Sequence, residues 1–156
     1  MRKPDRQSQG RRRRAGGATH RRGGAVLELV LVLPILLAIS FGATDYGYYF
    51  YVKNTIQGAA LAGGRAAAPV GAVNTDVTTA VANMMSASGF TSSTYTTTIT
   101  DINGNALDLS STGSGVPVKV TVSCSWGTVG VHALPVYLGG IPSTKTVSGV
   151  SVMMTE

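Results

Sequence analysis

The sequence predicts an α+β fold in which a long N-terminal transmembrane helix precedes a small antiparallel β-sheet domain with one short helix. Three observations lead to this prediction. Residues 25–43 are apolar except for one acid, Glu28. The helical signal then continues through an Ala- and Gly-rich segment to residue 68, and Pro69 ends the helix. The rest of the chain is rich in Thr, Ser and Val, with the alternation of polar and apolar residues that is typical of half-buried strands.

The basic residues are concentrated at the N-terminus. Residues 1–24 hold nine Lys or Arg and one acid, a net charge of +8, whereas the remainder holds four basic and six acidic residues, a net charge of −2. A short Arg- and Gly-rich tail without apolar periodicity cannot form a core. Positive charge next to an apolar span is retained in the cytoplasm, so Arg21 and Arg22 predict an N-in topology. A solvated basic tail is the alternative.

The apolar run is long enough to cross a bilayer. Its 19 residues would span about 28 Å as a helix, at ~1.5 Å per residue. Pro34 lies inside the run, and proline is tolerated within membrane helices. Five aromatic residues follow directly and predict an interfacial belt at the end of the span: Tyr46, Tyr48, Tyr49, Phe50 and Tyr51. For the apolar run, a buried helix of a soluble protein is the alternative. For the aromatic residues, stacking inside a small core is the alternative.

Small residues recur four apart in the second part of the helix, as in the pairs Ala59–Gly63 and Ala60–Gly64. This spacing allows helix backbones to approach closely. Plain helix propensity of an Ala-rich segment explains the same pattern.

The sequence as a whole predicts three domains: a basic leader (1–23), a hydrophobic helix (24–68, with its span at about 25–43) and an extracytoplasmic α+β domain (69–156).

Residues 69–156 predict one amphipathic helix and four strands. The helix covers 75–89, capped by Thr75 or Asp76, and its buried face is expected to comprise Val77, Val81, Met84 and Met85. Asn103-Gly104 predicts a hairpin turn between two strands. The clearest strand follows, with an inward face of Val116, Val118, Val120, Val122, Cys124 and Trp126. After a long packed loop (127–143), a last strand is expected to point Val150, Val152 and Met154 inward.

The sequence shows no arrangement of residues that predicts catalysis. No phosphate-binding loop, nucleophile elbow or metal-protease motif occurs, and His132 has no ligand partner at metal-binding spacing. Asp101, Asn103 and Asn105 partly match a calcium loop, but Thr112 stands where a glutamate is needed, and the hairpin turn explains the same residues. Cys124 is expected to be a buried, inert thiol. We therefore expect no enzyme, no catalytic residue, no metal and no cofactor.

Residues 20–68 resemble the N-terminus of type IV pilin-like proteins, and most closely the TadE-like pseudopilins of the tight adherence (Tad/Flp) system. The motifs that carry the resemblance are "RRGGAVLELVLVLPILL", the exit "FGATDYGYYFY" and the segment "IQGAALAGGRAAA". In that family a prepilin peptidase cuts after a glycine, and a glutamate occupies the fifth mature position. The resemblance assigns these roles to Gly23, which precedes the cut, to Gly24 as the new first residue, and to Glu28.

The resemblance implies a minor subunit rather than a major pilin. Major Flp pilins are shorter, and many carry Tyr or Phe where this chain has Leu29. It also implies the partners: the prepilin peptidase, an inner-membrane platform protein and other pilin-like subunits. An unpaired carboxylate is costly in apolar surroundings, so pairing Glu28 with a neighbour's freed amino group would specify helix register. A chance glutamate near the interface is the alternative.

Two other functions compete with this one. A signal-anchored or secreted small binding domain would be cut near Thr44 instead of at Gly24. Nucleic-acid binding through the arginine tail is disfavoured, because the tail lacks interleaved aromatics and the rest of the chain is acidic. We therefore expect a single-pass cell-membrane protein that contacts lipid and no nucleic acid, with a cytoplasmic N-terminus and an extracytoplasmic C-terminal domain.

Overall fold

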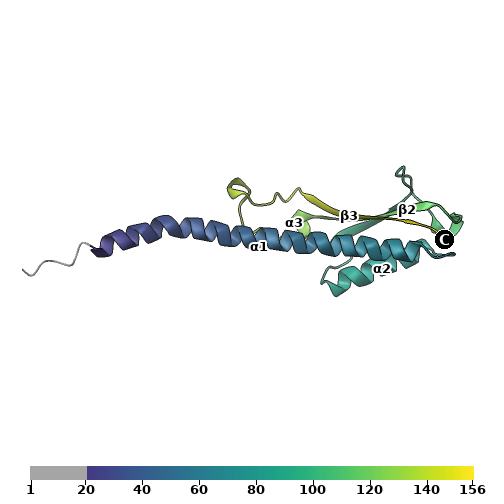
Figure 1. Ribbon diagram of the computed structural model, residues 1–156, viewed down its shortest axis with the longest axis horizontal. Coiled ribbons are helices and arrows are strands. Elements are labelled where there is room, and N and C mark those ends of the chain that lie inside the picture. The colour runs from purple at the N-terminus through teal and green to yellow at the C-terminus, as the bar shows by residue number, and fades with distance from the viewer. Residues whose placement is uncertain (1–20) are drawn as a thin grey trace, which may run out of the picture. The chain divides into compact units, whose positions relative to one another are not determined.

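The computed structural model describes residues 21–156, with the backbone alone for residues 21–23. The part of the predicted leader before Arg21 lies outside this range. The long helix α1 runs from Arg21 to Ala67 and contains Pro34 without interruption (Figure 1). The chain divides between Leu36 and Leu37 into two compact units, so the second unit includes the C-terminal part of α1.

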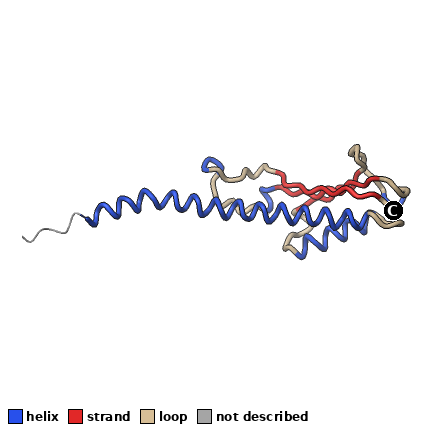
Figure 2. Tube along the Cα trace, in the orientation of Figure 1, coloured by secondary structure: helices blue, strands red, loops and turns tan. Residues whose placement is uncertain are grey.

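The second unit is a three-stranded antiparallel sheet covered on one face by helices. Its elements are α2 (Asn74–Ala87), β1 (Tyr95–Thr100), β2 (Pro117–Ser125) and β3 (Thr146–Met154), with the short helices η1 (Leu109–Ser111), α3 (Trp126–Val129) and η2 (Val136–Leu138) in the connections. The strand order is β1-β2-β3 (Figure 2). The predicted α+β class, with a long helix before a small antiparallel sheet, is confirmed.

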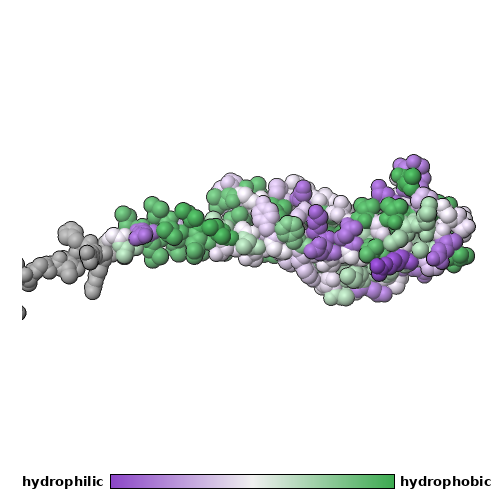
Figure 3. Space-filling model, in the orientation of Figure 1, coloured by the Kyte–Doolittle hydropathy of each residue, from purple (hydrophilic) through white to green (hydrophobic). Residues whose placement is uncertain are grey.

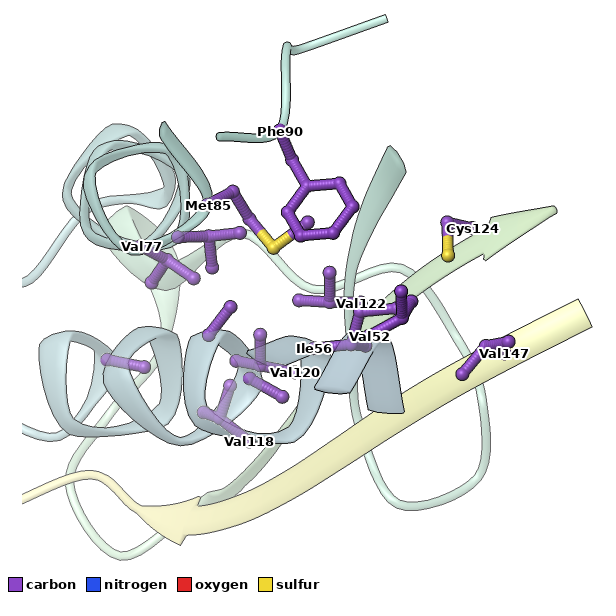
Figure 4. Packing of buried hydrophobic residues seen from close by; sticks show 14 of the residues in the cluster. Val52, Ile56, Val77, Met85, Phe90, Val118, Val120, Val122, Cys124 and Val147 are labelled. Carbon is purple, nitrogen blue, oxygen red and sulfur yellow. The ribbon is translucent and has the colours of Figure 1, made fainter. Parts of the chain in front are cut away.

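The core lies where α1, α2 and the inner face of β2 meet. Val118, Val120 and Val122 of β2 are fully buried, as predicted, in the same cluster as Val77 and Met85 of α2 (Figure 4). From α1, the fully buried core residues are Val52, Ile56, Ala59, Ala60 and Ala67. The small residues of α1 therefore pack against the sheet and α2 of their own chain.

Helix α2 begins one residue earlier than predicted and ends before Gly89. The N-cap residue is Val73 instead of Thr75 or Asp76, and Asp76 stabilises the first turn by accepting a hydrogen bond from the Val73 N–H at 3.1 Å. Val77, Val81 and Met85 are buried as predicted. The prediction for Met84 was wrong, because this side chain lies at the edge of the buried face and is 40% exposed.

The predicted hairpin yields only one strand. The turn at Asn103-Gly104 forms, and Gly104 adopts a φ of +92° that favours glycine. After it, pairing with β1 stops at a single bridge between Thr100 and Ala106. The Asn74 side chain explains this end of the pairing. Its amide nitrogen donates to the Leu107 carbonyl and its amide oxygen accepts from the Leu109 N–H, each at 3.1 Å. These two hydrogen bonds hold the segment after the turn at the start of α2. The sheet therefore has three strands instead of four.

Strand β3 presents the face opposite to the predicted one. Val150, Val152 and Met154 are exposed, whereas Val147, Gly149 and Ser151 are buried. The pairing with β2 fixes this orientation, because Ser151 lies opposite the buried Val120, and directly opposed residues share a face. Helix α1 lies so close to β3 that small residues are required there: a β-carbon on Gly149 would be 2.7 Å from the Ile56 carbonyl oxygen.

Candidate membrane and assembly surface

The first part of α1 is apolar on all its sides. Every side chain described between Gly24 and Leu37 is exposed, including the consecutive run from Leu29 to Leu33. Burying one such side chain is worth about 1.5–3 kcal/mol, so this surface requires an apolar environment. The helix is long and apolar enough to cross a membrane, and no part of its most apolar stretch is buried within the chain (Figure 3).

Glu28 is exposed within this apolar surface, between Leu27 and Leu29. Gly24 precedes it by four residues, a rise of about 6 Å along a helix. The predicted cleavage pair, Gly23 and Gly24, lies in the first turns of α1. The helix begins with Arg21 and Arg22. Their role in membrane topology stays a prediction, and so does cleavage after Gly23.

Three of the five aromatic residues after the predicted span pack against other rings of the second unit. Tyr48 and Tyr49 are half-buried, with ring centroids 6.0 and 5.4 Å from that of Trp126. Tyr51 stacks on Phe90 at 6.3 Å, and its hydroxyl donates to the Ser88 carbonyl. Packing of rings in the core, the less favoured alternative, thus holds for two of the five.

Three of the five aromatic residues keep about half of their surface exposed. Phe50 is 57% exposed, and Tyr46 and Tyr51 are each 47% exposed. The Tyr46 hydroxyl donates to the Gly139 carbonyl at 3.0 Å, so its ring lies against the loop before β3. The location of the five aromatic residues at the membrane interface stays a prediction.

The burial of Asp45 is a feature that the sequence analysis missed. In the sequence, Asp45 was noted only within the exit motif "FGATDYGYYFY", yet its side chain is fully buried. Its Oδ2 accepts a hydrogen bond from the Ile141 N–H at 3.3 Å. Together with the Tyr46–Gly139 bond, this contact attaches the loop before β3 to the helix just after the predicted span. An acid directly after an apolar run, within a continuing helix, is the feature that could have indicated a buried partner.

The described residues hold no group of three or more His, Cys, Asp or Glu side chains suited to a metal ion. The Asp101 carboxylate accepts hydrogen bonds from the Asn103 and Asn105 backbone and from the Asn105 side chain, at 2.8–2.9 Å. The Asn105 side chain contributes most to lowering the pKa of Asp101. The turn therefore already uses the acid of the partial calcium motif. Cys124 is buried, and burial raises the pKa of its thiol.

Comparison with known protein families adds an independent finding. The model of the family described as TadE-like protein matches residues 23–65. Neither the curated proteins nor the solved structures gave a significant match. The matched segment begins at the predicted cleavage glycine, includes Glu28 and Asp45, and ends in the part of α1 that packs on the sheet. The resemblance stated from the sequence is thereby confirmed over this segment: residues 23–65 are similar to TadE-like proteins.

Proposed function

We propose that this chain is a membrane-anchored minor subunit that takes part in assembling a Tad-type pilus or secretion apparatus. A prepilin peptidase removes the leader after Gly23, and α1 then holds the protein in the cell membrane with its β domain outside. The observation that carries the proposal is the match of residues 23–65 to TadE-like proteins, on a helix whose first part is exposed and, apart from Glu28, apolar.

The chemistry of assembly rests on Glu28. A carboxylate within hydrocarbon is costly unless a positive group lies beside it. Cleavage after Gly23 would create an amino group at Gly24, and a neighbouring subunit could bring that group to Glu28. Because an unpaired buried charge is penalised strongly, one register of helix packing would be favoured over its neighbours. The protein's work is then association with other pilin-like subunits and a platform protein, without catalysis.

The contacts of α1 disfavour the alternative of a secreted domain cut near Thr44. In the structure, the Thr44 hydroxyl donates to the Ser40 carbonyl within the helix. The next two residues, Asp45 and Tyr46, are bonded to the loop before β3. A cut there would require these contacts to open, whereas Gly23 and Gly24 lie in the first turns of α1.

Cysteine labelling in intact cells tests the membrane topology. In a Cys124→Ser background, Ile102→Cys places a thiol on the exposed turn of the domain. A membrane-impermeant maleimide should label it while the cytoplasmic membrane is intact, and the protein should resist alkaline extraction but dissolve in detergent. Labelling only after lysis, or recovery in the soluble fraction, would contradict the proposal. The Cys124→Ser protein without added cysteine is the matched control.

A further inference from the structure

The loop between α3 and β3 runs back along α1 (Figure 1). It is attached at three points, all within the second unit. Leu134 is buried and fills the space beside Gly42, where a β-carbon would lie 3.7 Å from the Leu134 Cδ2. The Gly139 carbonyl accepts the Tyr46 hydroxyl, and the Ile141 N–H donates to Asp45. The chain between these attachments is therefore held at the level of residues 42–46.

The tip of this loop is an exposed apolar turn. Its three residues form the short helix η2, and Val136, Tyr137 and Leu138 are 58, 86 and 55% exposed. The residues that flank the tip, Leu134 and Ile141, are buried instead. No Asp, Glu, Lys or Arg occurs between residues 127 and 144. A cluster of exposed apolar side chains without a charge nearby is typical of a surface that another apolar phase covers.

The position of the loop along α1 indicates which apolar environment covers its tip. Gly42, which Leu134 contacts, lies in the last turn of the predicted span (25–43), and Tyr46 lies about 6 Å farther along the helix. We propose that the η2 turn enters the outer boundary of the bilayer and forms a second membrane contact beside α1. This inference rests on the proposed function, because it requires the apolar part of α1 to span the membrane.

The neighbouring polar groups also fit a lipid surface. A cavity of about 270 Å³ beside the loop is lined by Tyr46, Tyr49, Gly140, Ile141, Pro142 and Lys145. Tyrosine rings concentrate at the headgroup level of membranes, and lysine extends its ammonium group toward phosphates. An apolar tip with tyrosines and a cation behind it matches the depth profile of a lipid leaflet, where interfacial segments are buried by about 5–10 Å. A second copy of the chain would not require this order of groups.

Depth-dependent quenching tests the proposal on the full chain in lipid nanodiscs. In a Cys124→Ser background, an environment-sensitive fluorophore is attached at Tyr137→Cys, Leu33→Cys or Ile102→Cys. Shallow doxyl lipids should quench the label at 137 several-fold more strongly than the label at 102, and its emission should shift to the blue. A label at 137 that behaves like the label at 102 would overturn the inference.

The label at Leu33 separates this inference from the proposed function. If deep doxyl lipids quench residue 33 but no lipid quenches residue 137, only the second membrane contact is refuted. If residue 33 is not quenched, the proposed function itself fails. A blue-shifted label at 137 without quenching, dependent on the number of protein copies per nanodisc, would show contact between copies and would also refute the lipid contact.

A charged variant gives a second, independent measurement. Tyr137→Glu adds a charge to a side chain that is 86% exposed, so the domain should still fold. A charge at the lipid boundary is unfavourable, and quenching of a label at Val136→Cys should fall toward the value at residue 102. The matched control is Ile102→Glu, which should leave the quenching at Val136→Cys unchanged. Equal quenching with and without Tyr137→Glu would contradict the proposal.

Discussion

Gly149 of β3 lies against the backbone of α1 at Ile56, so closely that a β-carbon on Gly149 would be 2.7 Å from the Ile56 carbonyl oxygen and 2.8 Å from the Gln57 Cα. The Gln57 side chain extends this contact, because its amide donates to the Val150 carbonyl at 2.9 Å and its oxygen accepts the Val150 N–H at 3.4 Å. The C-terminal part of the helix that carries the TadE-like segment is thus an integral part of the second unit.

Gly149→Ala should destabilise the second unit by about 1–3 kcal/mol, because the atoms it would strike belong to helix backbone and cannot rotate away. Chemical denaturation of the detergent-solubilised full chain, followed by fluorescence of the buried Trp126, measures this change. Gly113→Ala is the matched control, since nothing lies within 4 Å of its β-carbon position. Equal stability of the two variants would refute the close helix–strand contact.

Gly63→Ala and Gly47→Ala should have opposite effects although both change a glycine within α1. A β-carbon on Gly63 would lie 2.8 Å from the Val81 Cγ2 and 3.1 Å from the Val120 Cγ1, and valine side chains have little freedom to move. We expect a loss of about 1–3 kcal/mol. Nothing lies near Gly47, so alanine should stabilise the helix there by about 0.5–1 kcal/mol. The same denaturation experiment compares them, and a stabilising Gly63→Ala would contradict the packing described.

The thiol of Cys124 should be unreactive in the folded protein at neutral pH. Burial raises its pKa, so the thiolate is scarce, and the side chain is inaccessible. Because the folded-state pKa exceeds the unfolded value, the corresponding stability is present below an unfolded pKa of about 8.5 and is lost as pH rises through the folded value. Thiol labelling should therefore require denaturant, and the alkaline loss of stability should be smaller in Cys124→Ala. Rapid labelling of the native protein would be inconsistent with this account.

Glu28→Gln should leave insertion and folding intact but weaken association with other pilin-like subunits, because the neutral amide cannot form the ion pair. Cross-linking and co-purification from membranes measure this association. Glu156→Gln makes the same chemical change at an exposed residue of the second unit and should have no effect. If both variants associate as the natural chain does, Glu28 has no role in register.

The elements with strong periodicity were predictable from the sequence. The alternation of Val118, Val120 and Val122 identified the inner face of β2, and the apolar run identified the exposed part of α1, because these patterns directly reflect what each side chain contacts. The recognition of TadE-like residues likewise followed from a local motif around Gly23 and Glu28, which requires no knowledge of the tertiary structure.

Features that depend on contacts distant in sequence were not predictable in this way. Strand β3 has apolar residues on both faces, and only the approach of α1 requires Gly149 and Ser151 to point inward. The strand pairing of the hairpin ends where Asn74 binds the Leu107 carbonyl, 33 residues later in the chain. The burial of Asp45 depends on Ile141, 96 residues later. In each case a local pattern was overridden by one specific tertiary contact.

The mature N-terminus tests the central claim most directly. Intact-mass measurement and N-terminal sequencing of the protein purified from membranes should find a chain that begins at Gly24, with Glu28 as its fifth residue. A Gly23→Leu variant should remain uncleaved in the same cells, and a Gly42→Leu variant should still begin at Gly24. Mature protein that retains the arginine-rich leader, or that begins near Thr44, would contradict the account.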